Sequence, residues 1–195
     1  MSVRKLVRFS LLVALSFLLM YYVHFPIPPF PPYLKYDPSE VPALFASFAI
    51  SPGAGVLVVL VKNVLFFFSG RNVTGIIGVS ANFVAGASLV LTAGLIYRRM
   101  RTKRGALISL VAGCLAMTAT MAVANYFIFL PLWGIPRDQV GALLTAAIIP
   151  FNLVKSGLSS IATFLLYKRI KGLLALDVQP GPAPADSQLH RTWQT

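Results

Sequence analysis

The stretch "GIIGVSANFVAGASLVLTAGLIYRRMRTKR", residues 75–104, decides the fold class of this chain. Residues 75–97 contain no charged side chain, and five Arg and Lys residues then follow within positions 98–104. An apolar run of this length can cross the hydrocarbon core of a bilayer, which takes about 20 residues. We therefore expect a membrane-spanning helix that ends at the basic segment.

The whole chain has the same apolar character. It has 195 residues, of which 57% are hydrophobic and 11% charged, and its mean hydropathy is +0.77. These values are too apolar for a soluble domain and predict an all-α integral membrane protein. The single Cys114 excludes an internal disulfide, and the isolated His24 and His190 lack the spacing of metal ligands.

Six apolar segments predict a bundle of six transmembrane helices. They cover about 6–25, 39–50, 54–68, 75–97, 105–130 and 140–167. The Pro-rich stretch 26–32 ends the first segment, and "SPGAG" separates the second from the third. The first segment follows basic residues, as a signal peptide does, but no small-residue cleavage site comes after it, so we expect a retained helix.

The distribution of Lys and Arg predicts the orientation. With the N-terminus inside, eleven basic residues lie in cytoplasmic segments and only Lys35, Arg71 and Arg137 lie in external ones. This asymmetry places both termini in the cytoplasm, and it explains the net charge of +12 without a nucleic-acid partner. We expect a membrane domain over 1–172, followed by a Pro-rich, disordered cytoplasmic tail over 173–195.

Polar side chains on the last two predicted helices share one depth. Asn152, Lys155, Ser156 and Ser159 have helical spacing and form one stripe. The fifth helix runs outward and the sixth inward, so Asn125 lies at a similar depth, and these groups could meet around one cavity that opens outside. Asn82 and Thr118 are equally open to a role as interhelical hydrogen-bonding residues.

The two lysines in apolar segments need partners, because a charge at the bilayer centre costs about 2.5–3.5 kcal/mol. None of the five acids lies in the middle of an apolar run, so Lys155 lacks an intramembrane carboxylate. The nearest acids in the predicted topology are Asp37 and Glu40, beside the first external loop, and a salt bridge to either stays open. Lys62 either extends toward an interface or pairs with Glu40.

Enzymatic motifs are absent from the sequence. There is no GxxxxGK[ST], no HExxH and no pair of intramembrane carboxylates. Binding is therefore the predicted function. The aromatic side chains Tyr33, Tyr36, Tyr126, Phe127 and Phe151, with the amides and the ammonium, suit a flat heteroaromatic ligand with an imide-like edge. The alternatives of another class are a membrane enzyme acting on lipid and a small structural subunit.

Several motifs occur in one order along the chain: "LKYDPSEVPAL", "SPGAG", "VKN", "ANFVAG", "NYFIFLP" and "PFNLVKSG". In this order the chain resembles the riboflavin-binding S-components of energy-coupling factor (ECF) transporters over about residues 5–171. The resemblance implies six helices with both termini cytoplasmic, in the plasma membrane of a prokaryote. It implies riboflavin as the transported ligand, with FMN, another flavin or another vitamin as alternatives, and no cofactor.

The resemblance also implies which residues bind. In the family the Asn of "NYF" and the Asn and Lys of "PFNxxK" hold the isoalloxazine ring, and here these residues are Asn125, Asn152 and Lys155. The first external loop would cover the ligand with Leu34, Tyr36 and Asp37.

The partners implied by the resemblance are a membrane coupling subunit and two cytoplasmic ATPases. S-components dock on the coupling subunit through an AxxxA motif on the first helix. This chain has Ser10 and Ala14 at that spacing, a small-for-small departure that preserves close packing. The alternative is that both residues are ordinary helix positions.

Overall fold

The structure is a computed structural model that describes residues 3–175, and it is mostly helical. Residues up to Leu165 form one compact unit, which contains every feature discussed below, and the end of α8 from Leu166 belongs to a second unit. The longer helices are α1 (Val3–Tyr22), α2 (Glu40–Ala49), α3 (Pro52–Phe68), α4 (Gly75–Arg99), α5 (Lys103–Ala124) and α8 (Ile149–Ala175).

Two helical runs contain a π-helical turn. The first runs from α5 through η1 (Asn125–Phe129) into α6 (Leu130–Leu132), and the second from α7 (Arg137–Leu143) through η2 (Leu144–Ile148) into α8. Each of the six predicted segments is therefore helical. The predicted tail, 173–195, begins within the last residues of α8, and positions 176–195 lie outside the described residues.

Four of these runs are long and apolar enough to cross a membrane. They begin at Lys5, Gly75, Lys103 and Arg137, whereas α2 and α3 are shorter apolar helices. At 1.5 Å per residue, α2 is only about 15 Å long. Its residues from Glu40 to Ser47 are buried, so neighbouring elements enclose α2. A helix enclosed in this way need not be long enough to match the thickness of the bilayer.

Local sequence signals explain where the helices begin. Ser51 caps α3 by accepting a hydrogen bond from the Ala54 amide at 3.1 Å, and Pro52 occupies the first helical position. Thr102 caps α5 in the same way by accepting from the Gly105 amide at 2.9 Å. Between α1 and α2 the Pro-rich loop forms only a short antiparallel pair, β1 (Phe25–Pro26) with β2 (Lys35–Tyr36).

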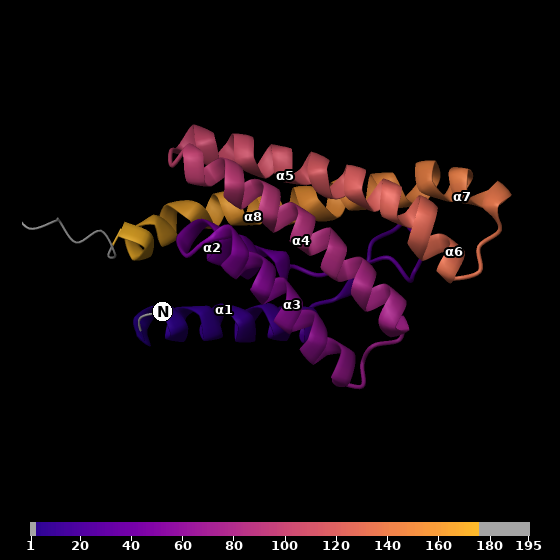
Figure 1. The fold of residues 1–195 in the computed structure, drawn as a ribbon, viewed down its shortest axis with the longest axis horizontal. Coiled ribbons are helices and arrows are strands. Elements are labelled where there is room, and N and C mark those ends of the chain that lie inside the picture. The colour runs from indigo at the N-terminus through magenta and orange to yellow at the C-terminus, as the bar shows by residue number, and fades with distance from the viewer. Residues whose placement is uncertain (1–2, 176–195) are drawn as a thin grey trace, which may run out of the picture. The chain divides into compact units, whose positions relative to one another are not determined.

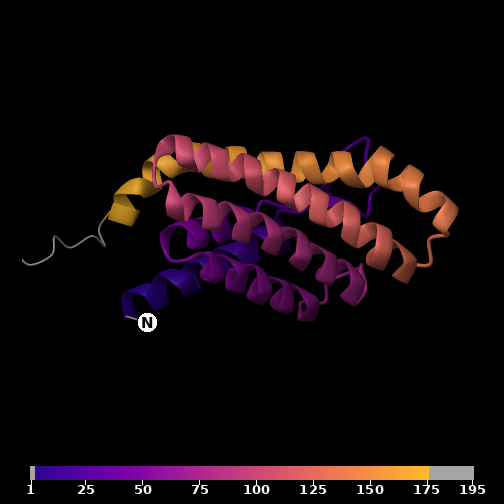
Figure 2. The ribbon, with the colours of Figure 1, turned by 45° about the horizontal axis from the view of Figure 1, so that its top comes forward.

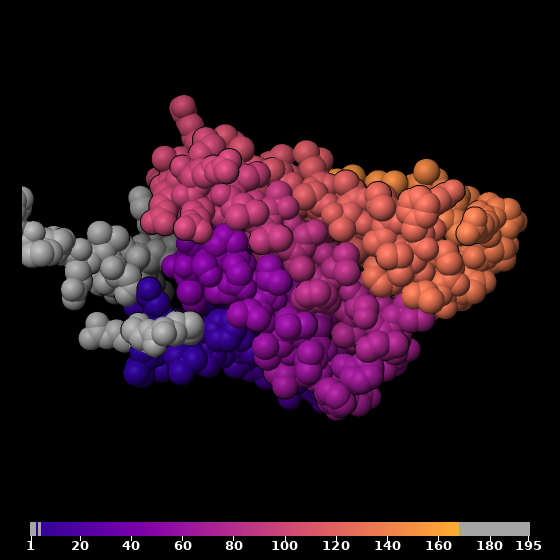
Figure 3. Space-filling view, viewed as in Figure 1, coloured from indigo at the N-terminus to yellow at the C-terminus, as the bar shows by residue number. Residues whose placement is uncertain are grey.

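The helix α4 lies between α3 and α5 and also contacts α2 (Figures 1 and 2). In the space-filling view, α3 and α4 lie against each other without a gap (Figure 3). A Cβ at Gly86 of α4 would lie 2.8 Å from Val59 Cγ1 of α3, so the glycine permits this approach. The shared core is apolar and includes Leu44, Val58, Leu89, Leu110 and Met117.

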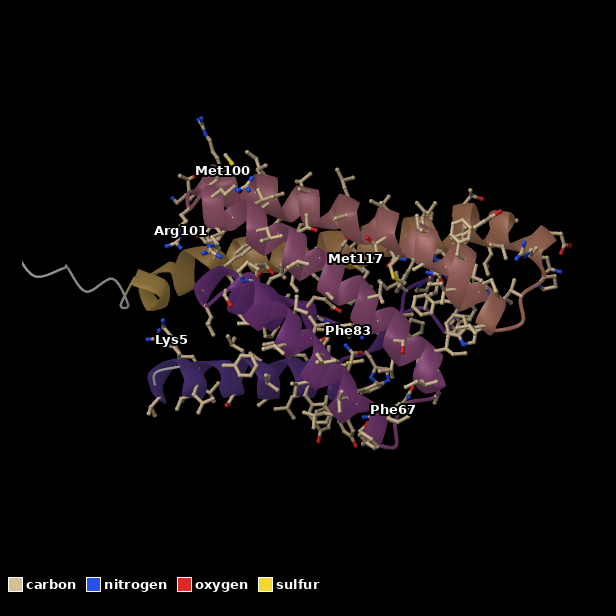
Figure 4. The ribbon with its side chains drawn as sticks, in the orientation of Figure 1. Lys5, Phe67, Phe83, Met100, Arg101 and Met117 are labelled. Atoms are coloured by element: carbon tan, nitrogen blue, oxygen red, sulfur yellow. The ribbon has the colours of Figure 1, made fainter. Side chains whose placement is uncertain are left out.

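Successive turns alternate between the two ends of the compact unit. The N-terminus, the α2–α3 turn and the α4–α5 turn lie at one end, and the α3–α4 turn and the α6–α7 connection lie at the other (Figures 1 and 2). Figure 4 shows the same polarity in side chains, with Lys5, Met100 and Arg101 at the first end and Phe67 toward the second. This alternation is the up-and-down order that the sequence predicts.

Candidate functional site

A cavity of about 140 Å³ lies inside the compact unit. Its lining comes from α1, the loop before α2, α3, α4, the η1 and η2 runs, and α8. Five of the predicted binding residues line this cavity, namely Leu34, Asp37, Asn125, Asn152 and Lys155. The two asparagines and the lysine thus meet around one cavity, as predicted.

Tyr36, the sixth predicted binding residue, is buried beside the cavity and is not among its lining residues. Its ring packs edge-on against Phe25 at 5.7 Å between centroids, across the β1–β2 pair. Among the expected aromatic residues, Tyr33 and Phe151 line the cavity. Tyr126 and Phe127 do not, since they are 50% and 69% exposed on the outer side of η1, so expecting them in the pocket was wrong.

The two asparagines present free acceptors to the cavity. The side-chain amide of Asn125 donates to the Met121 carbonyl at 2.8 Å, and that of Asn152 donates to the Ile148 carbonyl at 2.8 Å. Within the described part of the chain, neither Oδ1 atom has a hydrogen-bond partner. Each amide therefore offers one acceptor and one remaining N–H, which matches an adjacent N–H and C=O on a ligand edge.

Both asparagines stand next to a π-helical turn. Asn125 is the first residue of η1, and Asn152 lies four residues after η2. A proline follows each turn, Pro131 after η1 and Pro150 after η2. A proline in a helix interior clashes with the carbonyl four residues earlier, and a wider preceding turn relieves that clash. These prolines are the signal in the sequence from which the π turns could have been predicted.

A buried cluster of four charged side chains borders the cavity, and we call it the charge cluster: Asp37, Glu40, Lys62 and Lys155. Lys155 Nζ lies 3.2 Å from Asp37 Oδ2 and 3.6 Å from Glu40 Oε1. Lys62 Nζ lies 3.0 Å from Glu40 Oε1 and 3.9 Å from Asp37 Oδ1. Each side chain is at most 6% exposed, so two cations and two anions neutralise each other away from solvent.

The charge cluster settles both questions about the lysines. The salt bridge from Lys155 to Asp37 or Glu40, which the sequence left open, is present, because the loop after α1 turns inward and brings Asp37 to Lys155. The interpretation of Lys62 and Glu40 as a pair is confirmed. Lys62 and Glu40 do not line the cavity, so their pairing holds the cluster together from the side of α2 and α3.

Polar neighbours complete the charge cluster. The Ser39 hydroxyl donates to Asp37 and accepts from Lys62. Asn82 Oδ1 accepts from Lys155 Nζ at 2.8 Å, while the Asn82 amide donates to Asn63 Oδ1 at 3.2 Å. Asn82 also lines the cavity, so it belongs to the site, although the sequence left it open as an interhelical contact.

Two opposing effects act on Asp37, which lies in the loop before α2. Burial by itself raises the pKa of a carboxyl group, whereas the ammonium groups of Lys155 and Lys62 and the Ser39 hydroxyl lower it. The ammonium groups and the hydroxyl outweigh burial, so the pKa of Asp37 is held below its ordinary value. Asp37 is therefore an anion at neutral pH.

Lys155 can offer a donor to a ligand. An ammonium group has three N–H bonds, and hydrogen bonds to Asp37 and Asn82 use two of them. Glu40 Oε1 lies 3.6 Å from Nζ, beyond a normal hydrogen bond, and Lys155 lines the cavity, so the third N–H can turn to a carbonyl oxygen placed there. The site thus combines a charged donor with two amide acceptors.

Aromatic contacts hold the loop before α2 over the cavity. Phe30 packs edge-on against Phe151 at 5.6 Å between centroids, and Tyr33 packs against Trp133 at 6.2 Å. Tyr33, Trp133 and Phe151 also line the cavity. Aromatic rings therefore form part of the cavity wall, where a flat ring system can pack against them.

The family described as "ECF transporter, substrate-specific component" matches residues 4–167. The chain belongs to this family. It is 39% identical over 178 residues to the riboflavin transporter RibU of Staphylococcus aureus (strain TCH60), covering 88% of this chain and 92% of the relative.

Further relatives agree. This S-component is 33% identical to the riboflavin transporter FmnP of Bacillus subtilis (strain 168), covering 88% of this chain and 94% of that protein. A solved structure described as the S component of a bacterial ECF transporter is 40% identical, with a TM-score of 0.76, and covers 88% of this chain and 97% of that one. Family and relatives therefore point to a substrate-binding membrane component of a transporter rather than to an enzyme.

The predicted docking residues of this S-component lie on the surface of α1. Ser10 and Ala14 are both exposed and are one helical turn apart. The face of α1 that they share is thus open for contact with another helix.

Proposed function

We propose that this S-component binds riboflavin and delivers it to an ATP-driven ECF importer. The observation that carries the proposal is the convergence of Asn125, Asn152 and Lys155 on one cavity whose wall includes aromatic rings. Two amides with free Oδ1 atoms and one ammonium complement the carbonyl and imide edge of a flavin ring. Relatives at 39% and 33% identity are named riboflavin transporters, which supports the same ligand.

The loop before α2 moves when the ligand enters. The cavity of about 140 Å³ is smaller than ordinary ligand pockets, which measure about 300–1,000 Å³. The loop carries Leu34 and Asp37 into the cavity wall, and Tyr36 lies just behind them. In this proposal Leu34 and Tyr36 cover the bound ring, while Asp37 keeps its ion pair with Lys155 or yields part of it to a ligand carbonyl.

FMN is the second candidate ligand, and two cationic side chains favour testing it. Lys35 and Arg71 line the same cavity as Asn125, Asn152 and Lys155. Their cationic groups could neutralise a phosphate. The same cations could also contact the hydroxyls of the ribityl chain. Competition between riboflavin and FMN separates the two candidates.

We infer that the chain crosses the plasma membrane six times with both termini in the cytoplasm. The count of basic residues, eleven against three, supports this orientation, and α2 and α3 would span as enclosed short helices. The membrane domain covers 1–172 in this proposal. The end of the compact unit that carries the α4–α5 turn is then cytoplasmic.

The proposed partners are the membrane coupling subunit and two cytoplasmic ATPases. The sequence contains no ATP-binding loop of its own, so the energy must come from such a module. Ser10 and Ala14, exposed on α1, are the proposed contact with the coupling subunit. Two small residues one turn apart let a partner helix approach closely.

Flavin binding by the purified protein tests the proposal. Protein extracted in mild detergent is expected to show flavin absorbance and to quench riboflavin fluorescence on titration. An Asn125→Ala/Asn152→Ala variant is expected to lose this binding while retaining its thermal unfolding midpoint. A colourless wild-type protein that binds neither riboflavin nor FMN would refute the assignment.

A further inference from the structure

A second cavity lies at the opposite end of the compact unit from the α6–α7 connection. Its volume is about 210 Å³, and it shares no lining residue with the first cavity. Three elements form it: the end of α2 with Ser47, the start of α3 with Ser51, and the end of α4 and the segment after it with Gly94, Arg98 and Arg101. We call it the basic-end cavity.

Close packing around the basic-end cavity makes it a defined site rather than a surface dent. A Cβ at Gly94 would collide with the Ser47 hydroxyl and would lie 3.2 Å from Pro52 Cα. The glycine thus lets α4 approach the α2–α3 turn. On one wall, Phe48 and Tyr97 stack with centroids 4.3 Å apart, which fixes the position of α4 beside α2.

The basic-end cavity has a positive charge that the described part of the chain does not neutralise. Arg98 and Arg101 are exposed and make no ion pair or side-chain hydrogen bond within residues 3–175. Asp37 and Glu40 are committed to the charge cluster. The remaining acids are elsewhere: Asp138 lies in the first turn of α7 at the other end, and Asp177 and Asp186 lie outside the described residues.

An exposed apolar stripe leads into this cavity. Leu91 and Leu95 of α4 are 42% and 51% exposed. Together with Arg98 they are spaced i, i+4, i+7, so they lie on one face of the helix with the arginine at its end. Figure 4 shows Arg101 at this end of the bundle, where α4 passes toward α5. An anion with an attached apolar chain matches both features.

We propose that the basic-end cavity binds the phosphate headgroup of an anionic phospholipid. Arg98 and Arg101 hold the phosphate in the cavity that Ser47 and Ser51 also line, and an acyl chain lies along Leu91 and Leu95. Basic pockets between helices at the cytoplasmic membrane surface suit such headgroups. A free phosphate would use the arginines but not the leucine stripe, so the lipid is the favoured source.

Native mass spectrometry of the full chain in detergent tests this proposal. The probes are phosphatidylglycerol and phosphatidylcholine with identical acyl chains. Wild-type protein is expected to retain phosphatidylglycerol preferentially, and Arg98→Gln/Arg101→Gln should reduce this retention by about tenfold or more. The matched control, Arg99→Gln/Arg104→Gln, removes the same charge from residues outside the cavity and should bind as the wild type does.

Thermal unfolding supplies the second readout. Without added lipid, the three proteins are expected to unfold at the same temperature, which shows that the variants fold. Phosphatidylglycerol should then stabilise the wild type and the control but not Arg98→Gln/Arg101→Gln. An equal loss in both variants would mean a diffuse basic surface and overturn the proposal. Equal stabilisation by inorganic phosphate would overturn the lipid as the ligand.

Discussion

Lys155 belongs both to the charge cluster and to the lining of the cavity. Its ion pair with Asp37 joins residues 118 positions apart, and no local pattern in the sequence encodes such a pairing. The pair of Lys62 and Glu40 was easier to predict, since they lie on consecutive antiparallel helices. Lys155 pairs with Asp37 because the loop before α2 turns inward, and the sequence does not encode that direction.

Replacing Lys155 by Met is expected to lower both stability and ligand affinity. The change leaves Asp37 and Glu40 facing Lys62 alone, and breaking a buried pair in this way costs about 3–5 kcal/mol. Riboflavin affinity should fall by about 1.5–3 kcal/mol because a charge-assisted hydrogen bond is lost. Thermal unfolding and fluorescence titration measure the two effects.

The double variant Lys155→Met/Asp37→Asn separates these effects. It restores a neutral cluster, with Lys62 and Glu40 still paired, so most of the lost stability should return. Ligand affinity should stay low, with Asp37→Asn alone as the reference. Wild-type affinity in the double variant would show that Lys155 acts only within the protein.

The depressed pKa of Asp37 determines how pH affects stability. The folded-state pKa lies below the unfolded value, so the stabilisation is fully present above the unfolded value, about 3.9. It is lost only as the pH falls through the folded pKa. The difference in unfolding midpoint between wild type and Asp37→Asn should therefore stay constant from about pH 5 to 8. A difference that shrinks within this window would contradict the ion pair.

At the scale of elements, apolar length and flanking charges were enough to locate all six helical segments. The fourth was expected at 75–97 and runs to Arg99, and the third was expected at 54–68 and begins at Pro52. The π turns that begin at Asn125 and Leu144 were not predicted, and neither was the β1–β2 pair. These depend on single prolines and on loop packing, which hydrophobic periodicity does not report.

The pairing of α2 with α3 depends on Gly55. A Cβ there would lie 2.6 Å from Ser47 Cβ and 2.9 Å from the Ala43 carbonyl. Gly55→Ala is therefore expected to destabilise the protein by about 1–3 kcal/mol through overpacking. It should also weaken ligand binding, because α2 and α3 carry Glu40 and Lys62. Thermal unfolding and flavin titration measure both consequences.

Gly157 provides the matched control for Gly55. It lies in α8, and a Cβ there would meet nothing within 4 Å. Gly157→Ala should be neutral or stabilising by about 0.5–1 kcal/mol, because alanine favours a helix over glycine. If both variants had the same unfolding midpoint, Gly55 would not be a contact that the fold requires.

Over the whole molecule, the candidate binding site and the proposed docking surface are separate. The ligand cavity and the charge cluster lie inside the compact unit, whereas the proposed docking residues lie on the surface of α1. Membrane character was predictable from sequence because it is a local pattern, and the meeting of Asn125, Asn152 and Lys155 around one cavity followed from helical spacing and the alternating directions of the predicted helices. The inward loop, Asn82 and the basic-end cavity were not, because they arise only where distant elements meet.

The separation predicts that docking can be blocked without loss of ligand binding. Ala14 is exposed, so Ala14→Trp adds bulk outside the core and should leave riboflavin affinity and the unfolding midpoint unchanged. A large ring at this position prevents close helix approach, so co-purification with the coupling subunit and riboflavin uptake should be lost. The matched control is Leu115→Trp, at a 60% exposed position on α5, which should assemble and transport normally. Normal uptake by Ala14→Trp would place the docking surface elsewhere, whereas loss of uptake in both variants would indicate a general effect of an added ring rather than a specific interface on α1.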